Sequence, residues 1–318
     1  MKAIFSSFVM IAALGATIAV SQARTQPPDA LLLSCRGEVT VRRTDGTAAP
    51  GAYGLPLSAG DEIRTGPGAE AEIHFQNGTW ITVGASSSLV VRAAGGPVPG
   101  RAAPEAGEAF ASVQSFLTLK DAEGVSTLAA IRSGSAADDI RLEAPCRTAV
   151  RGGHPRFRWS SADPSTELRL KLYDESGLRW QTDVAGTSAA EYPAGEPPLE
   201  PGTIYSWTLE TTDPLRVPPV RTPAGFFEVL SAAEERSLDT LLAAAEARRA
   251  PSESARRIVR ASALFGYRLL DDAVAEMRLA IEADPDNAAL RTILARLYAE
   301  TGRTVEALQE YNRLIERR

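Results

Sequence analysis

A change of hydrophobic period near Ser231 constrains the fold more than any other feature of the sequence. Before this point apolar and polar residues alternate as in half-buried β-strands, for example at Leu168, Leu170 and Leu172. After it the apolar residues recur with the 3.6-residue period of amphipathic helices. A chain of 318 residues has room for two or three domains. The sequence therefore predicts a multidomain protein that is β in its N-terminal part and α in its C-terminal part.

The first expected domain covers residues 24–146. Its strongest β signal lies in the stretch 57–91, where Asn77-Gly78 separates two alternating segments. This dipeptide predicts a hairpin with a type I′ turn, in which both central residues have positive φ. We expect the alternating apolar residues of strand 71–75 to face a β core.

Several short motifs make this region similar to the FecR-like domain family. The matching residues are Gly60-Asp61, Thr65-Gly66, the Asn77-Gly78 turn and an opening strand at 37–43. The resemblance implies an extracytoplasmic β module that contacts other proteins and performs no catalysis. It also suggests a signalling component that regulates a sigma factor. Only three residues precede the N-terminal apolar run, so we expect no cytoplasmic domain for that output.

Residues 147–230 are expected to form a separate small β-sandwich, because short alternating segments are separated by turn residues at intervals typical of sandwiches. The expected strands are 156–160, 168–173, 178–182, 204–211 and 225–230. Trp159, Tyr205 and Trp207 make this region resemble a fibronectin type III or immunoglobulin-like module.

The remaining residues, 231–318, are expected to be helical. Ser231 and Glu234 have the spacing of a capping box at the start of a helix over 232–249. Beyond it, small and aromatic residues recur at an interval of 34, as in Ala261 and Ala295. The pattern resembles two tetratricopeptide repeats, at 254–287 and 288–318. Two such repeats are marginal alone, so we expect the preceding helix or the sandwich to pack on them.

The resemblance to tetratricopeptide repeats implies a protein-binding concave face formed by the first helix of each unit. The family positions on that face are Ile258, Ser262, Phe265, Thr292, Arg296 and Glu300. Phe265 and Arg296 are residue types that often anchor interfaces. The alternative is that Phe265 belongs to the core and that Arg296 is a solvated charge.

The N-terminus has the pattern of a signal peptide over residues 1–23. An uncharged run from Ile4 to Val20 is followed by small residues, and cleavage is expected after Ala23. The alternative is an uncleaved anchor. With cleavage, we expect a periplasmic or secreted protein with no membrane span. The formal net charge of −6 and the lack of a basic stripe disfavour nucleic acid as a partner.

The two cysteines, Cys35 and Cys146, bracket the first expected domain. In an oxidising compartment they could form a disulfide, and the alternative is two buried thiols that do not meet. No cofactor is expected. Glu70, Glu72 and His74 would share one strand face, which is read as a solvated polar face in preference to a metal site. No nucleophile–base pair or phosphate-binding loop is evident, so we expect no enzyme.

The most consistent function is therefore a non-enzymatic extracytoplasmic scaffold or adaptor of the bacterial cell envelope. Its C-terminal repeats would contact an envelope protein, with peptidoglycan as a further candidate partner. The alternatives are a FecR-like sensing component and an envelope glycan-binding or glycan-acting protein.

Overall fold

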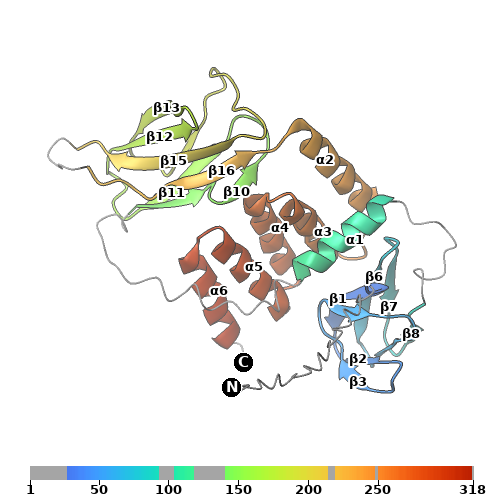
Figure 1. The fold of residues 1–318 in the computed structure, drawn as a ribbon. Helices are drawn as coiled ribbons and strands as arrows, with labels where there is room; N and C mark the ends of the chain where they lie inside the picture. Colours follow the sequence, from blue (N-terminus) through green and yellow to red (C-terminus); the bar gives the residue numbers. More distant parts are fainter. Residues whose placement is uncertain (1–26, 93–103, 118–139, 214–218, 248–249, 317–318) are drawn as a thin grey trace, which may run out of the picture.

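The computed structural model describes residues 27–92, 104–117, 140–213, 219–247 and 250–316. A helical region lies between two β modules (Figure 1). The expected organisation, β and then α, is confirmed. The expected signal peptide and the Gly/Pro-rich segment around residue 100 lie outside the described residues.

The N-terminal β-domain consists of two four-stranded sheets that pack over one core. The first sheet has the order β4-β1-β6-β7 and the second the order β3-β2-β5-β8. The strands are β1 (Ala30–Arg36), β2 (Val39–Arg42), β3 (Ala48–Pro50), β4 (Leu55–Leu57), β5 (Glu62–Thr65), β6 (Glu70–Phe75), β7 (Trp80–Val83) and β8 (Ser88–Val90). As the alternation predicts, Ala71, Ile73 and Phe75 face the core between the sheets.

The hairpin between β6 and β7 is confirmed, but its turn is not of type I′. Gly78 has a φ of 81°, whereas Asn77 has no positive φ. The Gly78 N–H donates to the Phe75 carbonyl at 2.8 Å, and the Thr79 N–H donates to the Asn77 side chain at 2.9 Å. The loop is therefore one residue longer than predicted, with glycine at the left-handed position of a bulged turn.

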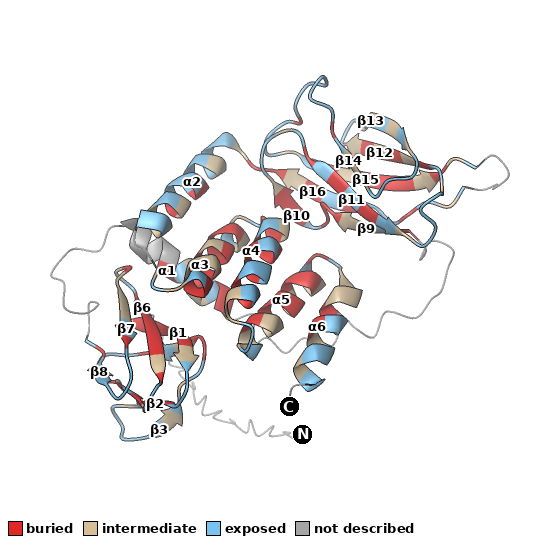
Figure 2. Cartoon of the chain, turned by 180° about the vertical axis from the view of Figure 1, so that it is seen from behind, coloured by how far each residue is buried: buried red, intermediate tan, exposed pale blue. Residues whose placement is uncertain are grey.

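The inner strands β1 and β6 of the sheet β4-β1-β6-β7 are buried on both faces, which simple alternation does not predict. In β1, Ala30 and Leu32 face the core of the β-domain, while Leu31 and Leu33 belong to the core of the helical region. In β6, His74 lies opposite to the face that carries Ile73 and is only 3% exposed. The red inner strands of Figure 2 show this two-sided burial. The β-domain is thus packed onto the helices by one face of its own sheet.

The second module is a two-sheet β-sandwich of the architecture that fibronectin type III and immunoglobulin-like modules share. One sheet has the order β14-β11-β9 and the other the order β10-β16-β15-β12-β13, with β10 parallel to β16. The strands are β9 (Ile140–Ala144), β10 (Thr148–Val150), β11 (Arg156–Ser161), β12 (Leu168–Asp174), β13 (Gly177–Val184), β14 (Ala189–Glu191), β15 (Ile204–Thr211) and β16 (Gly225–Val229). The Tyr205 hydroxyl accepts a hydrogen bond from the Glu200 N–H at 2.9 Å, which is a tyrosine corner.

The sandwich begins earlier than the sequence indicates. β9 pairs with β11, so the module starts at Ile140 and not at residue 147. This pairing also decides between the two alternatives for the cysteines, in favour of thiols that do not meet. Cys35 lies in the N-terminal β-domain and Cys146 is buried in the sandwich, and both are free thiols. Burial raises the pKa of each thiol to about 11.

The helical region contains a helix that the sequence reading did not assign. The helices are α1 (Pro104–Leu117), α2 (Ala232–Ala247), α3 (Glu253–Gly266), α4 (Leu270–Ala283), α5 (Ala288–Glu300) and α6 (Thr304–Glu316). The helix α1 comes from the chain between the two β modules and packs against α3 and α2. Phe110, Val113, Phe116 and Leu117 of α1 join the helical core. The sequence left residues 110–120 open as a strand or a short helix, and the structure has a helix there that belongs to the helical core and not to the β-domain expected over 24–146.

The predicted start of α2 and the paired helices of the repeats are confirmed. The Ser231 N–H donates to the Glu234 carboxylate at 2.9 Å, and the Glu234 N–H donates to the Ser231 hydroxyl at 3.2 Å. The helices α3 and α4 form one hairpin and α5 and α6 the next. Ala261, Ala295 and Ala307 are fully buried, which lets the paired helices approach closely.

Candidate functional site

The expected binding face of the first repeat is largely covered. Ile258 is 0% and Ser262 is 1% exposed, and the Ser262 hydroxyl donates to the Val259 carbonyl at 2.7 Å. Phe265 is half-buried, with its ring 5.5 Å from that of Phe116 on α1. The expectation that Ile258 and Ser262 contact a partner is therefore corrected, because both side chains are buried in the helical core.

The expected positions in the second repeat stay at the surface of α5. Thr292 is half-buried and donates its hydroxyl to the Ala288 carbonyl at 3.2 Å. Arg296 forms an ion pair with Glu300 at 3.3 Å. Glu300 also borders a groove that Phe265 lines from the first repeat. Two of the six expected positions, one from each repeat, are thus brought to the same groove.

This groove runs between α1, the end of α3 and the edge of the sandwich, and its volume is about 940 Å³. We call it the junction groove. The sandwich and the helical region both contribute lining residues, which are Ala111, Ser112, Ser115, Arg147, Phe226, Phe265, Gly266, Arg268, Leu270 and Glu300. The size is at the upper end of the range typical of ligand sites.

A second cleft continues from the junction groove towards the turn between α5 and α6. Its volume is about 580 Å³, and Arg147 and Phe226 line both cavities. Arg141 of β9 and Glu306 of α6 border its far side. The two cavities therefore share one wall and form a path from the first repeat to the second along the sandwich edge.

The connections that carry Arg147 and Arg268 are fixed by backbone hydrogen bonds. The Arg147 N–H donates to the Phe226 carbonyl at 2.6 Å, and the Ala149 N–H donates to the Arg268 carbonyl at 2.8 Å. The Thr148 hydroxyl donates to the same Arg268 carbonyl at 3.0 Å and accepts from the Leu270 N–H at 2.9 Å. The sandwich is thereby joined to the turn between α3 and α4.

Both arginines have a left-handed backbone. The φ angle is 54° at Arg147 and 60° at Arg268, and among the described residues Ser86 is the one further non-glycine residue with positive φ. This conformation costs about 1 kcal/mol for a residue that has a Cβ atom. Both arginines are exposed, and neither guanidinium has a hydrogen bond or an ion pair within the described part of the chain.

Arg303 fixes the other side of the second cleft. Its guanidinium pairs with Asp271, lies over the Tyr298 ring at 5.8 Å and donates to the Glu143 carbonyl at 3.0 Å. Burial lowers the pKa of Arg303 below its usual value. This arginine therefore ties the second repeat to β9 of the sandwich and has a structural role in the cleft.

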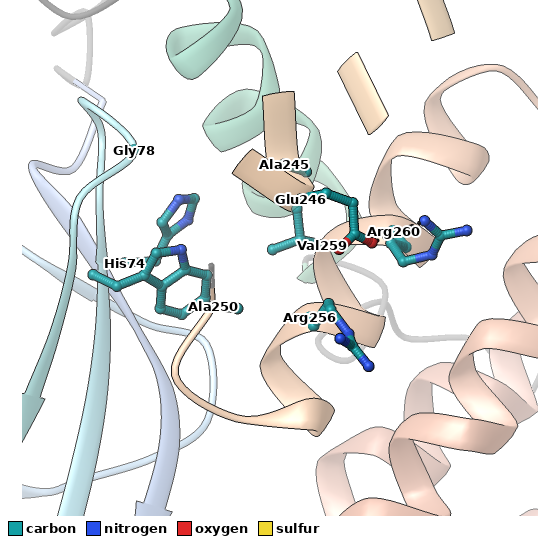
Figure 3. A pocket seen from close by; sticks show the side chains of 9 residues that line it. His74, Gly78, Ala245, Glu246, Ala250, Arg256, Val259 and Arg260 are labelled. Carbon is teal, nitrogen blue, oxygen red and sulfur yellow. Dashed lines mark hydrogen bonds and ion pairs between the residues drawn. The ribbon is translucent and has the colours of Figure 1, made fainter. Parts of the chain in front are cut away.

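The contact between the N-terminal β-domain and the helices encloses a small pocket (Figure 3). Its volume is about 10 Å³, room for about one water molecule. His74 stacks on Trp80 with ring centroids 4.4 Å apart, facing Val259 and Arg260 of α3. Such a pocket is too small to hold an organic ligand, and we assign it to the packing of the two regions.

The strand face that carries Glu72 and His74 is buried. The expectation that Glu70, Glu72 and His74 form a solvated polar face is therefore corrected for these two residues. Glu72 is 6% exposed and accepts a hydrogen bond from the Ser252 hydroxyl at 2.8 Å. Burial raises the pKa of Glu72, and the Ser252 hydrogen bond partly opposes this. Within the described ranges no group of three or more histidine, cysteine or acidic side chains could hold a metal ion.

The sequence reading did not single out Phe226, Arg147 or Arg268. The alternation of β16 could have shown that one of Phe226 and Phe227 points outwards; in the structure Phe226 is 51% exposed and Phe227 is buried. No local signal pairs Arg147 with Arg268, since they meet only through tertiary contacts. None of the described helices is long and apolar enough to cross a membrane.

Comparison with known families identifies the C-terminal segment. Residues 264–318 match the tetratricopeptide repeat family. The matched part covers the end of α3 and all of α4, α5 and α6, the helices that form the two hairpins described above. Over this segment the chain is therefore similar to tetratricopeptide repeats. No curated protein sequence matches the chain.

Three solved structures are similar to parts of the chain. The FN1–FN3 domains of chicken CNTN1 are 9% identical, with a TM-score of 0.21, over 64% of this chain and 55% of that chain. The central fibronectin-III array of RIM-binding protein is 11% identical, with a TM-score of 0.18, over 65% and 59%. A β-1,2-glucanase from Parabacteroides distasonis is 10% identical, with a TM-score of 0.22, over 91% and 49%. These TM-scores are too low for the likenesses to bear on this chain's fold or function.

Proposed function

We propose that this protein is a non-enzymatic, extracytoplasmic scaffold of the bacterial cell envelope, and that it binds a partner protein at the junction groove. The observation that carries the proposal is the groove itself. It is built jointly by the tetratricopeptide repeats, α1 and the fibronectin-like sandwich. Tetratricopeptide repeats are protein-binding arrays that use extended concave surfaces.

The packing of the modules supports a scaffold. The N-terminal β-domain is joined to the helices by Leu31 and Leu33, and the sandwich is joined to them by Thr148 and Arg303. Buried apolar contacts and hydrogen bonds of this kind hold the walls of the groove in place before a partner arrives, which lowers the entropy cost of binding.

The proposed location rests on the signal-peptide pattern of residues 1–23, and the FecR-like nature of the N-terminal β-domain rests on its turn motifs. Mass spectrometry of the purified mature protein tests the location. A chain that starts at Arg24 is the expected result, and an intact Met1 in a soluble fraction would contradict it.

The binding role is tested by site-specific photo-cross-linking in the full chain, because α1 is part of the helical core and a fragment over 231–318 would lack it. A photoreactive residue at Ala111, which lines the groove, is compared with one at Glu175, which lies in the exposed turn between β12 and β13. The expected result is a protein adduct at Ala111 and none at Glu175.

The captured protein is then purified, and its binding to the unlabelled chain is measured by calorimetry. Equal adducts at both positions, or a captured protein without measurable affinity, would contradict the proposed role of the groove.

A further inference from the structure

We propose that the junction groove recognises an acidic segment of the partner protein, with its carboxylates on Arg147 and Arg268 and an apolar side chain on Phe226. This inference rests on the proposed protein-binding function and names the chemistry of the partner. The two arginines come from the β9–β10 and α3–α4 connections, so the recognition surface differs from the helix positions that the repeat family uses.

The charge of the groove supports an acidic partner. Its charged lining residues are Arg147, Arg268 and Glu300, and Glu300 is already paired with Arg296 at 3.3 Å. The two remaining arginines are exposed and have no ionic partner within the described ranges. The chain as a whole carries a formal charge of −6. An acidic segment is therefore attracted here and repelled by much of the remaining surface.

The backbone around the arginines supports a fixed recognition site. Both residues keep a left-handed conformation that glycine or asparagine would adopt at lower cost. The hydrogen bonds through Thr148 and the Phe226 carbonyl hold the two connections together. The backbone that carries each arginine is thus fixed beside the groove, and an arginine guanidinium can bind a carboxylate in a bidentate manner.

The apolar part of the groove supports a hydrophobic anchor beside the acidic residues. Phe226 is 51% exposed, and the half-buried Phe265 lines the same groove. Aromatic and arginine side chains are enriched among the residues that dominate binding energies. With about 940 Å³, the groove can hold several residues of an extended segment.

The test measures fluorescence anisotropy of labelled peptides with the full mature chain. The probe is a short peptide in which glutamates flank one phenylalanine. Its glutamine counterpart and its lysine counterpart are the comparison peptides, and a labelled single-stranded oligonucleotide tests for a general preference for anions. We expect saturable binding of the acidic peptide alone, weakened by added salt.

The variants Arg147→Asn and Arg268→Asn remove the charges and keep a residue that tolerates positive φ, so the fold is retained. Each is expected to weaken acidic-peptide binding by about fivefold, the effect of one exposed ionic contact. Phe226→Ala should lower the affinity for the acidic peptide that contains phenylalanine. It should leave the affinity for an acidic peptide with alanine at that position unchanged. Arg42→Gln removes an exposed arginine of β2 that lines neither cavity, and it should have no effect.

Binding of the acidic peptide that is insensitive to both arginine substitutions would overturn the proposal, and so would equal binding of the glutamine peptide or of the oligonucleotide. If the Ala111 cross-link yields a genuine partner but no acidic peptide binds, the acidic recognition fails while the scaffold function stands. If neither binds, both fail.

Discussion

The substitution Phe116→Ala tests whether α1 is an integral part of the repeat region. Phe116 is 0% exposed and belongs to the core that the helices share. Its ring lies 5.5 Å from that of Phe265, with the two planes tilted by 58°. The segment that carries Phe116 precedes the sandwich in the chain, whereas Phe265 follows it.

The expected loss of stability follows from this burial. Truncation of a fully buried phenylalanine to alanine costs about 3–5 kcal/mol, because transfer energy is lost and a cavity is left. Of this, about 0.5–1.5 kcal/mol belongs to the aromatic pair with Phe265. For a helical region of about 100 residues, a loss of about 4 kcal/mol lowers the melting temperature by about 16–32 °C.

The assay is urea unfolding of the full chain followed by circular dichroism at a wavelength dominated by the helices. Gln114→Ala, on a half-buried position of the same helix, is the matched control and should change the unfolding free energy by less than about 0.5 kcal/mol. A double-mutant cycle with Phe265→Ala isolates the ring contact. A loss below about 1 kcal/mol for Phe116→Ala would refute the assignment of α1 to the helical core.

Three further predictions concern single sites. Because burial raises the folded-state pKa of Glu72 above its usual 4.5, its contribution to stability is complete below that pH and is lost as the pH rises through the folded value. Glu72→Gln should therefore stabilise the protein at neutral pH and not at pH 4, and an equal effect at both would contradict this. Ser231→Ala should lower the unfolding free energy by about 1 kcal/mol, measured by thermal unfolding, because α2 loses its N-terminal cap. Ser231→Asp should retain most of that stability, because aspartate also caps helices. Cys35 and Cys146, whose pKa values are about 11, should react with a thiol reagent at pH 8 only after unfolding, and rapid labelling of the native protein would oppose this.

Local patterns of apolar and polar residues predicted a helix or strand well where one of its faces packs on a single core and the other is exposed to solvent. The strand at Ile204–Thr211 was predicted with the bounds that the structure has, because Tyr205, Trp207 and Leu209 face the sandwich core and alternate with polar residues. The capping box at Ser231 was equally readable, since its hydrogen bonds join residues three apart. The small residues of the repeats determine close helix packing by their size alone.

The local patterns failed where an element meets two cores or a distant partner. Glu72 and His74 alternate with apolar residues, which is the pattern of a strand with one solvated face. Both side chains are buried because the helices pack against this face. The segment of α1 has too few long-range cues to show that it packs on α3, a helix more than a hundred residues later. The choice between a disulfide and two separate thiols depended on tertiary structure for the same reason, because β9 belongs to the sandwich and Cys146, which follows it, is buried in the sandwich core.

The sequence by itself determined the order of the modules, the period of each and the repeats at the C-terminus, because these depend on contacts within short segments. The tertiary structure alone decided where the proposed partner site lies. It covered Ile258 and Ser262, and it brought Arg147, Phe226 and Arg268 to one groove. The physical reason is that the groove lies between modules, and its shape depends on which buried surfaces the modules share.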